Sequence, residues 1–167
     1  MYRLLAAAAV CALLCSCEGT VDKVMADFGL KERPEGYVSG SDKVMEQLNG
    51  VGAMEMKRMN MEEQRGSVKF QKENVVRGKY YKEVKKYESY VPTDAQAMNR
   101  PSLNDSGYVG YLDFTYRMYQ SERKPTSAEA AAESATIPAD VTGHETYRYT
   151  FSSTGQWNGS KGEHARN

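Results

Sequence analysis

The clearest pattern along the chain is a period-two alternation of apolar and mixed positions from Tyr108 to Gln120. Successive side chains of a β-strand point to opposite faces, so this alternation predicts a strand with one buried face. The predicted core face is Tyr108, Gly110, Leu112, Phe114, Tyr116 and Met118. The predicted outer face is Val109, Tyr111, Asp113, Thr115, Arg117 and Tyr119.

Two other segments alternate in the same way and are also predicted to be strands. The first begins at Ser67, where Val68 and Phe70 alternate with polar neighbours, and the second is 145–153, with aromatic residues at every other position. Thr154-Gly155 predicts a turn after the second strand, and Trp157 keeps the parity of its aromatic face.

The segment 79–91 fits two structures. Its spacing of Tyr80, Val84, Tyr87 and Val91 suits one helical face, whereas its Tyr and Val content and the following Pro92 suit a long edge strand. We favour the strand because the neighbouring segments are strands. Residues 92–106 are then expected to be a connection of about fifteen residues.

Helical patterns precede the strands. Thr20 is a predicted N-cap for 21–30, and Ser41 for a second helix with Val44, Leu48 and Val51 on one face. The methionines of 54–61 form no single stripe, so the pattern there indicates either a helix contacted on two sides or a helix-to-strand transition. Later, Thr126 and Glu129 form a capping box for the Ala-rich segment 128–135, which Pro138 keeps from continuing.

This order of elements predicts an α+β domain with N-terminal helices packed on an antiparallel β-meander of about 3–5 strands. By this interpretation residues 17–40 are a tether with a short helix, 41–158 are one domain, and 159–167 are a polar tail.

The first seventeen residues differ from the rest. Arg3 is the only charge in a three-residue start, an uncharged apolar run covers 4–14, and Cys15-Ser16-Cys17 follows. A positive start, about 7–15 apolar residues and a small-residue boundary are typical of a secretory signal. The run is too short to cross a bilayer as a helix, which needs about 20 apolar residues. Residues 1–16 are therefore predicted to be a cleaved signal peptide.

The boundary Leu14-Cys15-Ser16-Cys17 resembles the lipobox of bacterial lipoproteins. The resemblance covers only this signal region, and it implies cleavage before Cys17 and a thioether-linked diacylglycerol on the Cys17 sulfur. The competing box, which ends at Cys15, has bulky Leu14 where a small residue is preferred. The resemblance implies a membrane-anchored protein of the bacterial cell envelope with a periplasmic or extracellular domain. Glu18 after Cys17 favours the outer membrane if the cell has two.

Composition and charge narrow the range of functions that we expect of the chain. All three cysteines, Cys11, Cys15 and Cys17, lie at or before the predicted cleavage site, so the mature chain has no disulfide and no Cys-based metal site. Loss of Arg3 leaves 21 basic and 22 acidic residues, which gives no argument for nucleic-acid binding. Residues 57–86, however, carry 10 basic and 4 acidic side chains.

We expect no catalysis and no cofactor. His144 and His164 are the only histidines, and the chain has no nucleophile elbow, no metal-ligand cluster and no phosphate-binding glycine loop. The expected role is structural or interactive, with an envelope protein or an anionic polymer as candidate partner.

The alternative is a periplasmic binding module for a sugar, a peptide or an anionic wall polymer. Ten tyrosines lie from residue 80 onward, and amphipathic rings can line such a site, although they also suit a half-buried sheet. Lysines beside them could contact an anionic membrane or polymer, or could protect an edge strand from aggregation. The candidate surface is Tyr111, Tyr119, Trp157, Lys79, Lys82 and Lys86.

Overall fold

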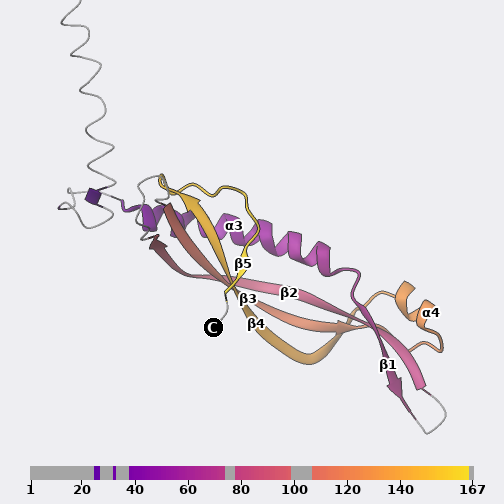
Figure 1. Ribbon diagram of the computed structural model, residues 1–167. Coiled ribbons are helices and arrows are strands. Elements are labelled where there is room, and N and C mark those ends of the chain that lie inside the picture. The colour runs from indigo at the N-terminus through magenta and orange to yellow at the C-terminus, as the bar shows by residue number, and fades with distance from the viewer. Residues whose placement is uncertain (1–24, 27–31, 33–37, 74–77, 99–106, 166–167) are drawn as a thin grey trace, which may run out of the picture.

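The structure is a computed structural model that describes residues 25–26, 32, 38–73, 78–98 and 107–165 of the 167-residue chain (Figure 1). Its described elements are, in order, α3 (Gly40–Glu63), β1 (Ser67–Lys72), β2 (Gly78–Ala97), β3 (Gly107–Gln120), α4 (Ser127–Ala132), β4 (Ile137–Ser152) and β5 (Glu163–His164). The strands form one antiparallel sheet in the order β1-β2-β3-β4-β5. The predicted α+β class is confirmed, and the sheet is a meander. Most of the first predicted helix, 21–30, lies outside the described residues.

Helix α3 is longer than its sequence suggested. Its N-cap is Ser39, whose hydroxyl accepts a hydrogen bond from the Asp42 backbone N–H at 3.1 Å. The prediction of Ser41 as the cap is wrong by two residues, because Ser39 has the extended backbone of a cap and Ser41 already lies in the helix. The helix continues through Gly50, Gly52 and the methionine cluster to Glu63, so the helix-to-strand transition is excluded.

Two glycines of α3 allow tyrosine rings to touch the helix. A Cβ atom at Gly52 would lie 2.3 Å from the Tyr90 ring, and one at Gly40 would lie 2.1 Å from the Tyr108 hydroxyl. Gly50, by contrast, has nothing within 4 Å of such an atom. The helix therefore accepts the lower helix propensity of glycine at two positions where close packing requires it.

Strand β2 confirms that 79–91 are extended. It continues to Ala97, so the predicted connection over 92–106 is wrong in its first part. Pro92 pairs with Leu112 of β3 beside an irregularity of the register. Strand β1 flanks β2 only over Gly78–Glu83, and in the described part of the chain only β3 pairs with β2 beyond Val84. Pro92 is tolerated there because a strand edge needs no donor on its open side.

Strands β3 and β4 follow the predicted parity except at Val109, which was predicted on the outer face of β3 but is buried. Tyr108, Leu112 and Phe114 are buried, and so are Tyr149 and Phe151 on β4. Strand β4 begins eight residues before the predicted start at Glu145. The structure also differs from the expected polar tail over 159–167, because Glu163 and His164 pair with β4 as strand β5.

The core lies between α3 and the sheet, with α3 contacting mainly β2 and β3 (Figure 1). It is a single cluster of Val44, Leu48, Val51, Met59, Tyr87, Tyr108, Leu112, Phe114, Tyr149 and Phe151. Beyond this core, β1 and the start of β2 project past the end of α3 (Figure 1).

Candidate functional site

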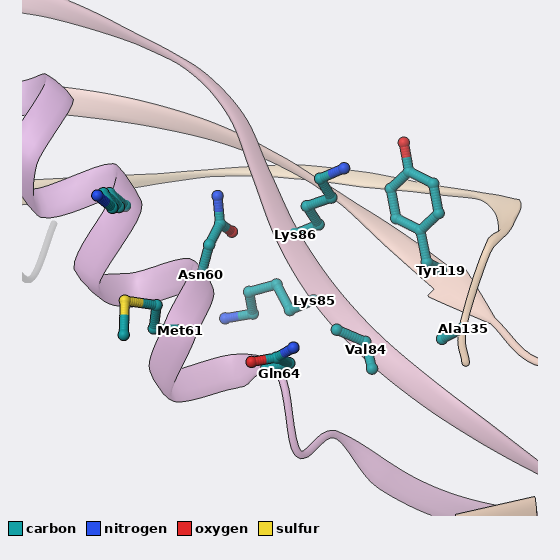
Figure 2. A pocket seen from close by; sticks show the side chains of 9 residues that line it. Asn60, Met61, Gln64, Val84, Lys85, Lys86, Tyr119 and Ala135 are labelled. Atoms are coloured by element: carbon teal, nitrogen blue, oxygen red, sulfur yellow. The ribbon is translucent and has the colours of Figure 1, made fainter. Parts of the chain in front are cut away.

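A cleft of about 400 Å³ lies where the last turns of α3 meet the open edge of β2 (Figure 2). Its walls come from α3, β2, the end of β3 and the residue Ala135 before β4. The lining residues are Lys57, Asn60, Met61, Gln64, Val84, Lys85, Lys86, Tyr119 and Ala135. No carboxylate is among them.

The alternation of β2 places two consecutive lysines on opposite sides of its edge. Figure 2 shows Lys85 extending from β2 toward α3, whereas Lys86 and Tyr119 project side by side away from the helix. Both lysines line the same cleft because the edge of β2 is open there.

Tyr119 forms the polar rim of the cleft. The Lys86 ammonium lies 5.3 Å from the centre of the Tyr119 ring, within cation–π range. The Tyr119 hydroxyl donates a hydrogen bond to Glu88 at 2.7 Å. This bond raises the pKa of Tyr119, and it places the Glu88 carboxylate, which also pairs with Arg117 at 3.5 Å, beside the rim.

Asn60 occupies the open edge of β2 at the floor of the cleft. Its amide nitrogen donates to the Tyr87 carbonyl at 2.9 Å, and its oxygen accepts from the Tyr87 N–H at 2.8 Å. The side chain thus makes the two hydrogen bonds that a neighbouring strand would make. It also fixes the distance between the helix and the strand edge.

The lysines of the cleft differ in their partners. Lys85 donates to Glu145 at 2.6 Å and lies 4.7 Å from the centre of the Tyr116 ring. Burial opposes its charge, but the hydrogen bond and the charge of Glu145 outweigh burial and raise the pKa of Lys85. Lys57 and Lys86 make no ion pair with any described residue. The charged residues that line the cleft are therefore all lysines, although Glu145 and Glu63 act on Lys85 and Glu88 bonds the lining Tyr119.

A second, smaller cavity of about 220 Å³ has balanced charges. It lies between α3, β4 and the segment before β5, and its lining includes Arg58, Glu62 and Lys161. Arg58 makes two hydrogen bonds of 2.8 Å to the buried Glu55, and it bonds Glu62 at 2.8 Å. Lys161 pairs with Glu62 at 2.7 Å. The charges of this network are paired with each other. We therefore interpret the network as a structural link between the C-terminal segment and α3, and not as a ligand-binding site.

The structure brings together two of the six residues of the predicted surface, Lys86 and Tyr119. Lys79 pairs with Glu73 at 3.0 Å, and Lys82 stands in the part of β2 that β1 covers. Tyr111 is in the middle of β3, and Trp157 packs against the core.

Sequence reasoning missed the helical wall of the cleft. Lys57, Asn60, Met61 and Gln64 are spaced as one face of a helix, and this spacing was a signal that could have grouped them. What the spacing could not show is that this face lies opposite Lys85 and Lys86.

The histidines do not form a catalytic arrangement. The Nδ1 atom of His144 lies 3.2 Å from the Thr115 hydroxyl and 3.8 Å from an Asp113 oxygen. A nucleophile and an orienting carboxylate must contact opposite ring nitrogens, but here both contact the same one. His164 packs edge-on against the Tyr147 ring, with 5.3 Å between the ring centres. Within 25–26, 32, 38–73, 78–98 and 107–165, no group of three or more His, Cys, Asp and Glu could hold a metal ion.

Comparisons with protein-family models, with curated proteins and with solved structures found no match to this chain.

Proposed function

We propose that the chain is an exported bacterial lipoprotein, anchored through a diacylglycerol on Cys17, whose folded domain has a non-catalytic structural or interaction role in the cell envelope. The observation that carries this proposal is the resemblance of Leu14-Cys15-Ser16-Cys17 to a lipobox after a positive start and a short apolar run. Glu18 favours the outer membrane, with the domain periplasmic or extracellular.

The proposal includes an architecture in which N-terminal helices pack on one side of the meander. Its support comes from α3, because Val44, Leu48 and Val51 share one core cluster with Leu112 and Phe114. A core of this kind suits an exported domain whose sequence has no cysteine after Cys17 and so no disulfide to stabilise it.

Lipid attachment would supply the membrane affinity. Each buried CH₂ contributes about 0.8 kcal/mol, and two acyl chains anchor a protein stably where one gives only marginal binding. Neither helix in the described ranges is both long and apolar enough to span a bilayer.

The test compares two cysteine variants expressed in bacteria. Cys17→Ser removes the sulfur that would carry the lipid, whereas Cys15→Ser alters a neighbouring cysteine of the same signal. We expect wild type and Cys15→Ser to partition into the detergent phase and to resist extraction with about 1 M salt, where surface charges are screened beyond about 3 Å. Cys17→Ser should move to the aqueous phase.

Retention of Cys17→Ser in the detergent phase would contradict the proposal. If the Cys15→Ser protein left the detergent phase, the anchor would be at Cys15, and this would contradict the assignment of the lipobox.

The second candidate function is a periplasmic binding module. It is favoured by one observation, the cleft with three lysines and no carboxylate among its lining residues. An anchored protein with such a site would hold an anionic envelope component near the membrane.

A further inference from the structure

We propose that Asn158 is a site of spontaneous deamidation, at which the side-chain amide is converted to aspartate and isoaspartate with water as the only co-reactant. The chain has two Asn-Gly dipeptides, Asn49-Gly50 and Asn158-Gly159, and the fold leaves only the second free to react. This modification goes beyond the proposed function and does not depend on a lipid at Cys17.

The reaction joins the backbone nitrogen of Gly159 to the side-chain carbon Cγ of Asn158. As this bond forms, the bond from Cγ to Nδ2 breaks, the proton of the Gly159 N–H passes to the departing nitrogen, and ammonia leaves. Water then adds to either carbonyl of the resulting succinimide and opens the ring to aspartate or to isoaspartate. Because glycine has no Cβ, the attacking nitrogen is not shielded by a side chain.

The backbone at Gly159 is free to make this attack. Asn158 and Gly159 lie between β4 and β5 in a segment that is neither helix nor strand (Figure 1). The Gly159 N–H donates no hydrogen bond to any residue of the described ranges. A Cβ atom at Gly159 would have nothing within 4 Å, so the surroundings leave room for the backbone to move.

The contacts of the Asn158 side chain lie on the atoms that change charge in the reaction. Its Oδ1 accepts a hydrogen bond from the Ser160 N–H at 3.0 Å. Negative charge develops on this oxygen when nitrogen adds to Cγ, so the Ser160 N–H can stabilise it as an oxyanion-hole donor does. The departing nitrogen Nδ2 lies 3.3 Å from the Thr150 hydroxyl, a group that can exchange a proton with it.

Asn49-Gly50 has the same sequence but a fixed backbone. It lies inside α3, where each N–H is held by the carbonyl four residues earlier. The Asn49 carbonyl also accepts a hydrogen bond from the Tyr90 hydroxyl at 3.0 Å. The Gly50 nitrogen can reach the Asn49 side chain only when this part of the helix opens, which lowers the rate. Asn49 and Asn158 are both exposed, so access of water does not distinguish them.

The products would alter the segment that joins the C-terminal residues to the rest of the fold. Aspartate adds a negative charge shortly before Lys161, which pairs with Glu62 of α3 at 2.7 Å. Isoaspartate places Cβ in the main chain and so lengthens it ahead of β5, where Glu163 pairs with Arg148. The isoaspartyl product should therefore disturb the pairing of β4 with β5 more than aspartate does.

The test incubates the full-length protein, in a non-ionic detergent, in heavy-oxygen water at mildly alkaline pH, with and without guanidinium chloride. Digestion in ordinary water followed by mass spectrometry measures, at each asparagine, the heavy oxygen that opening of the succinimide introduces. In the folded protein Asn158 should lose its amide about tenfold faster than Asn49 or more, because the helix holds the Gly50 nitrogen out of position. In guanidinium chloride the two rates should agree within about twofold, since neither backbone is then fixed.

Two matched variants assign the ammonia that the folded protein releases. Asn158→Gln should remove most of it, because the longer side chain closes its ring much more slowly. Asn49→Gln exchanges the same side chains inside α3 and should leave the release unchanged.

Equal rates at Asn158 and Asn49 in the folded protein would overturn the inference, and so would loss of the Asn158 amide in guanidinium chloride alone. An unchanged release of ammonia from Asn158→Gln would also overturn it. None of these outcomes depends on detergent partitioning of Cys17→Ser, so failure of this inference and failure of the anchor are distinguishable.

Discussion

At the scale of single residues, burial separates two neighbours on β3. Phe114 is fully buried in the core, with its ring near Tyr87, Tyr90 and Tyr147, whereas Thr115 points to the other face beside His144. Phe114→Asp should lower the free energy of unfolding by several kcal/mol, because an unpaired charge would replace an apolar ring. Thr115→Asp should change it by less than about 1 kcal/mol. Thermal unfolding of the two variants would show equal losses only if the parity of β3 were wrong.

The second feature at this scale is the cluster of polar side chains that contact Glu145. Burial alone would raise the pKa of Glu145, but hydrogen bonds from Lys85 and Tyr87 outweigh it and hold that pKa below the ordinary value of 4.5. The pKa of its partner Lys85 is raised above 10.5. A carboxyl whose folded-state pKa is depressed stabilises the fold above its unfolded pKa, and this contribution is lost as the pH falls through the folded value.

The ion pair should therefore have a measurable pH profile. Glu145→Gln should lower the free energy of unfolding by about 1–3 kcal/mol at neutral pH. The difference from wild type should stay constant between about pH 6 and 9, where both charges are present, and shrink below about pH 4.5. Chemical denaturation across this range would measure it. A difference that is the same at pH 3 as at pH 7 would mean that packing, not charge, is lost.

At the scale of elements, substitutions at two glycines of α3 test how closely the helix packs against the sheet. Gly52→Ala should destabilise the protein, because the new methyl group would lie 2.3 Å from the Tyr90 ring and more than offset the gain of about 1 kcal/mol in helix propensity. Gly50→Ala has nothing within 4 Å and should stabilise by about 0.5–1 kcal/mol. Melting temperatures should thus move in opposite directions, and an increase for both would place Tyr90 elsewhere.

The elements that the sequence predicted are those with strong periodicity or clear caps. Strand β3 and the second half of β4 alternate over many residues, and Thr126 caps α4, accepting from the Glu129 N–H at 3.3 Å. The first half of β4 was missed because Pro138 and Gly143 interrupt its pattern. Strand β5 has two residues, too few to show a period.

At the scale of the whole molecule, the cleft depends on a meeting of elements that no local pattern contains. The basic content of 57–86 indicated where positive charge accumulates, but Lys79 and Lys82 from that segment stand outside the cleft. Lys57 and Asn60 became neighbours of Lys85 and Lys86 only because α3 and β2 pack together. The sequence therefore indicated a segment rich in lysine, but it could not show which of these lysines line one cleft.

The whole molecule is thus proposed to be a lipid anchor followed by an α+β domain with a basic cleft. The anchor is the central claim, since it decides the compartment in which the cleft operates. The most direct measurement is the intact mass of the wild-type protein extracted from bacterial membranes, with fragmentation of its N-terminus. We expect a chain that begins at Cys17, with the mass of at least a diacylglycerol on that N-terminal residue. An unmodified chain that retains residues 1–16, or a lipid-free chain cleaved elsewhere, would contradict it.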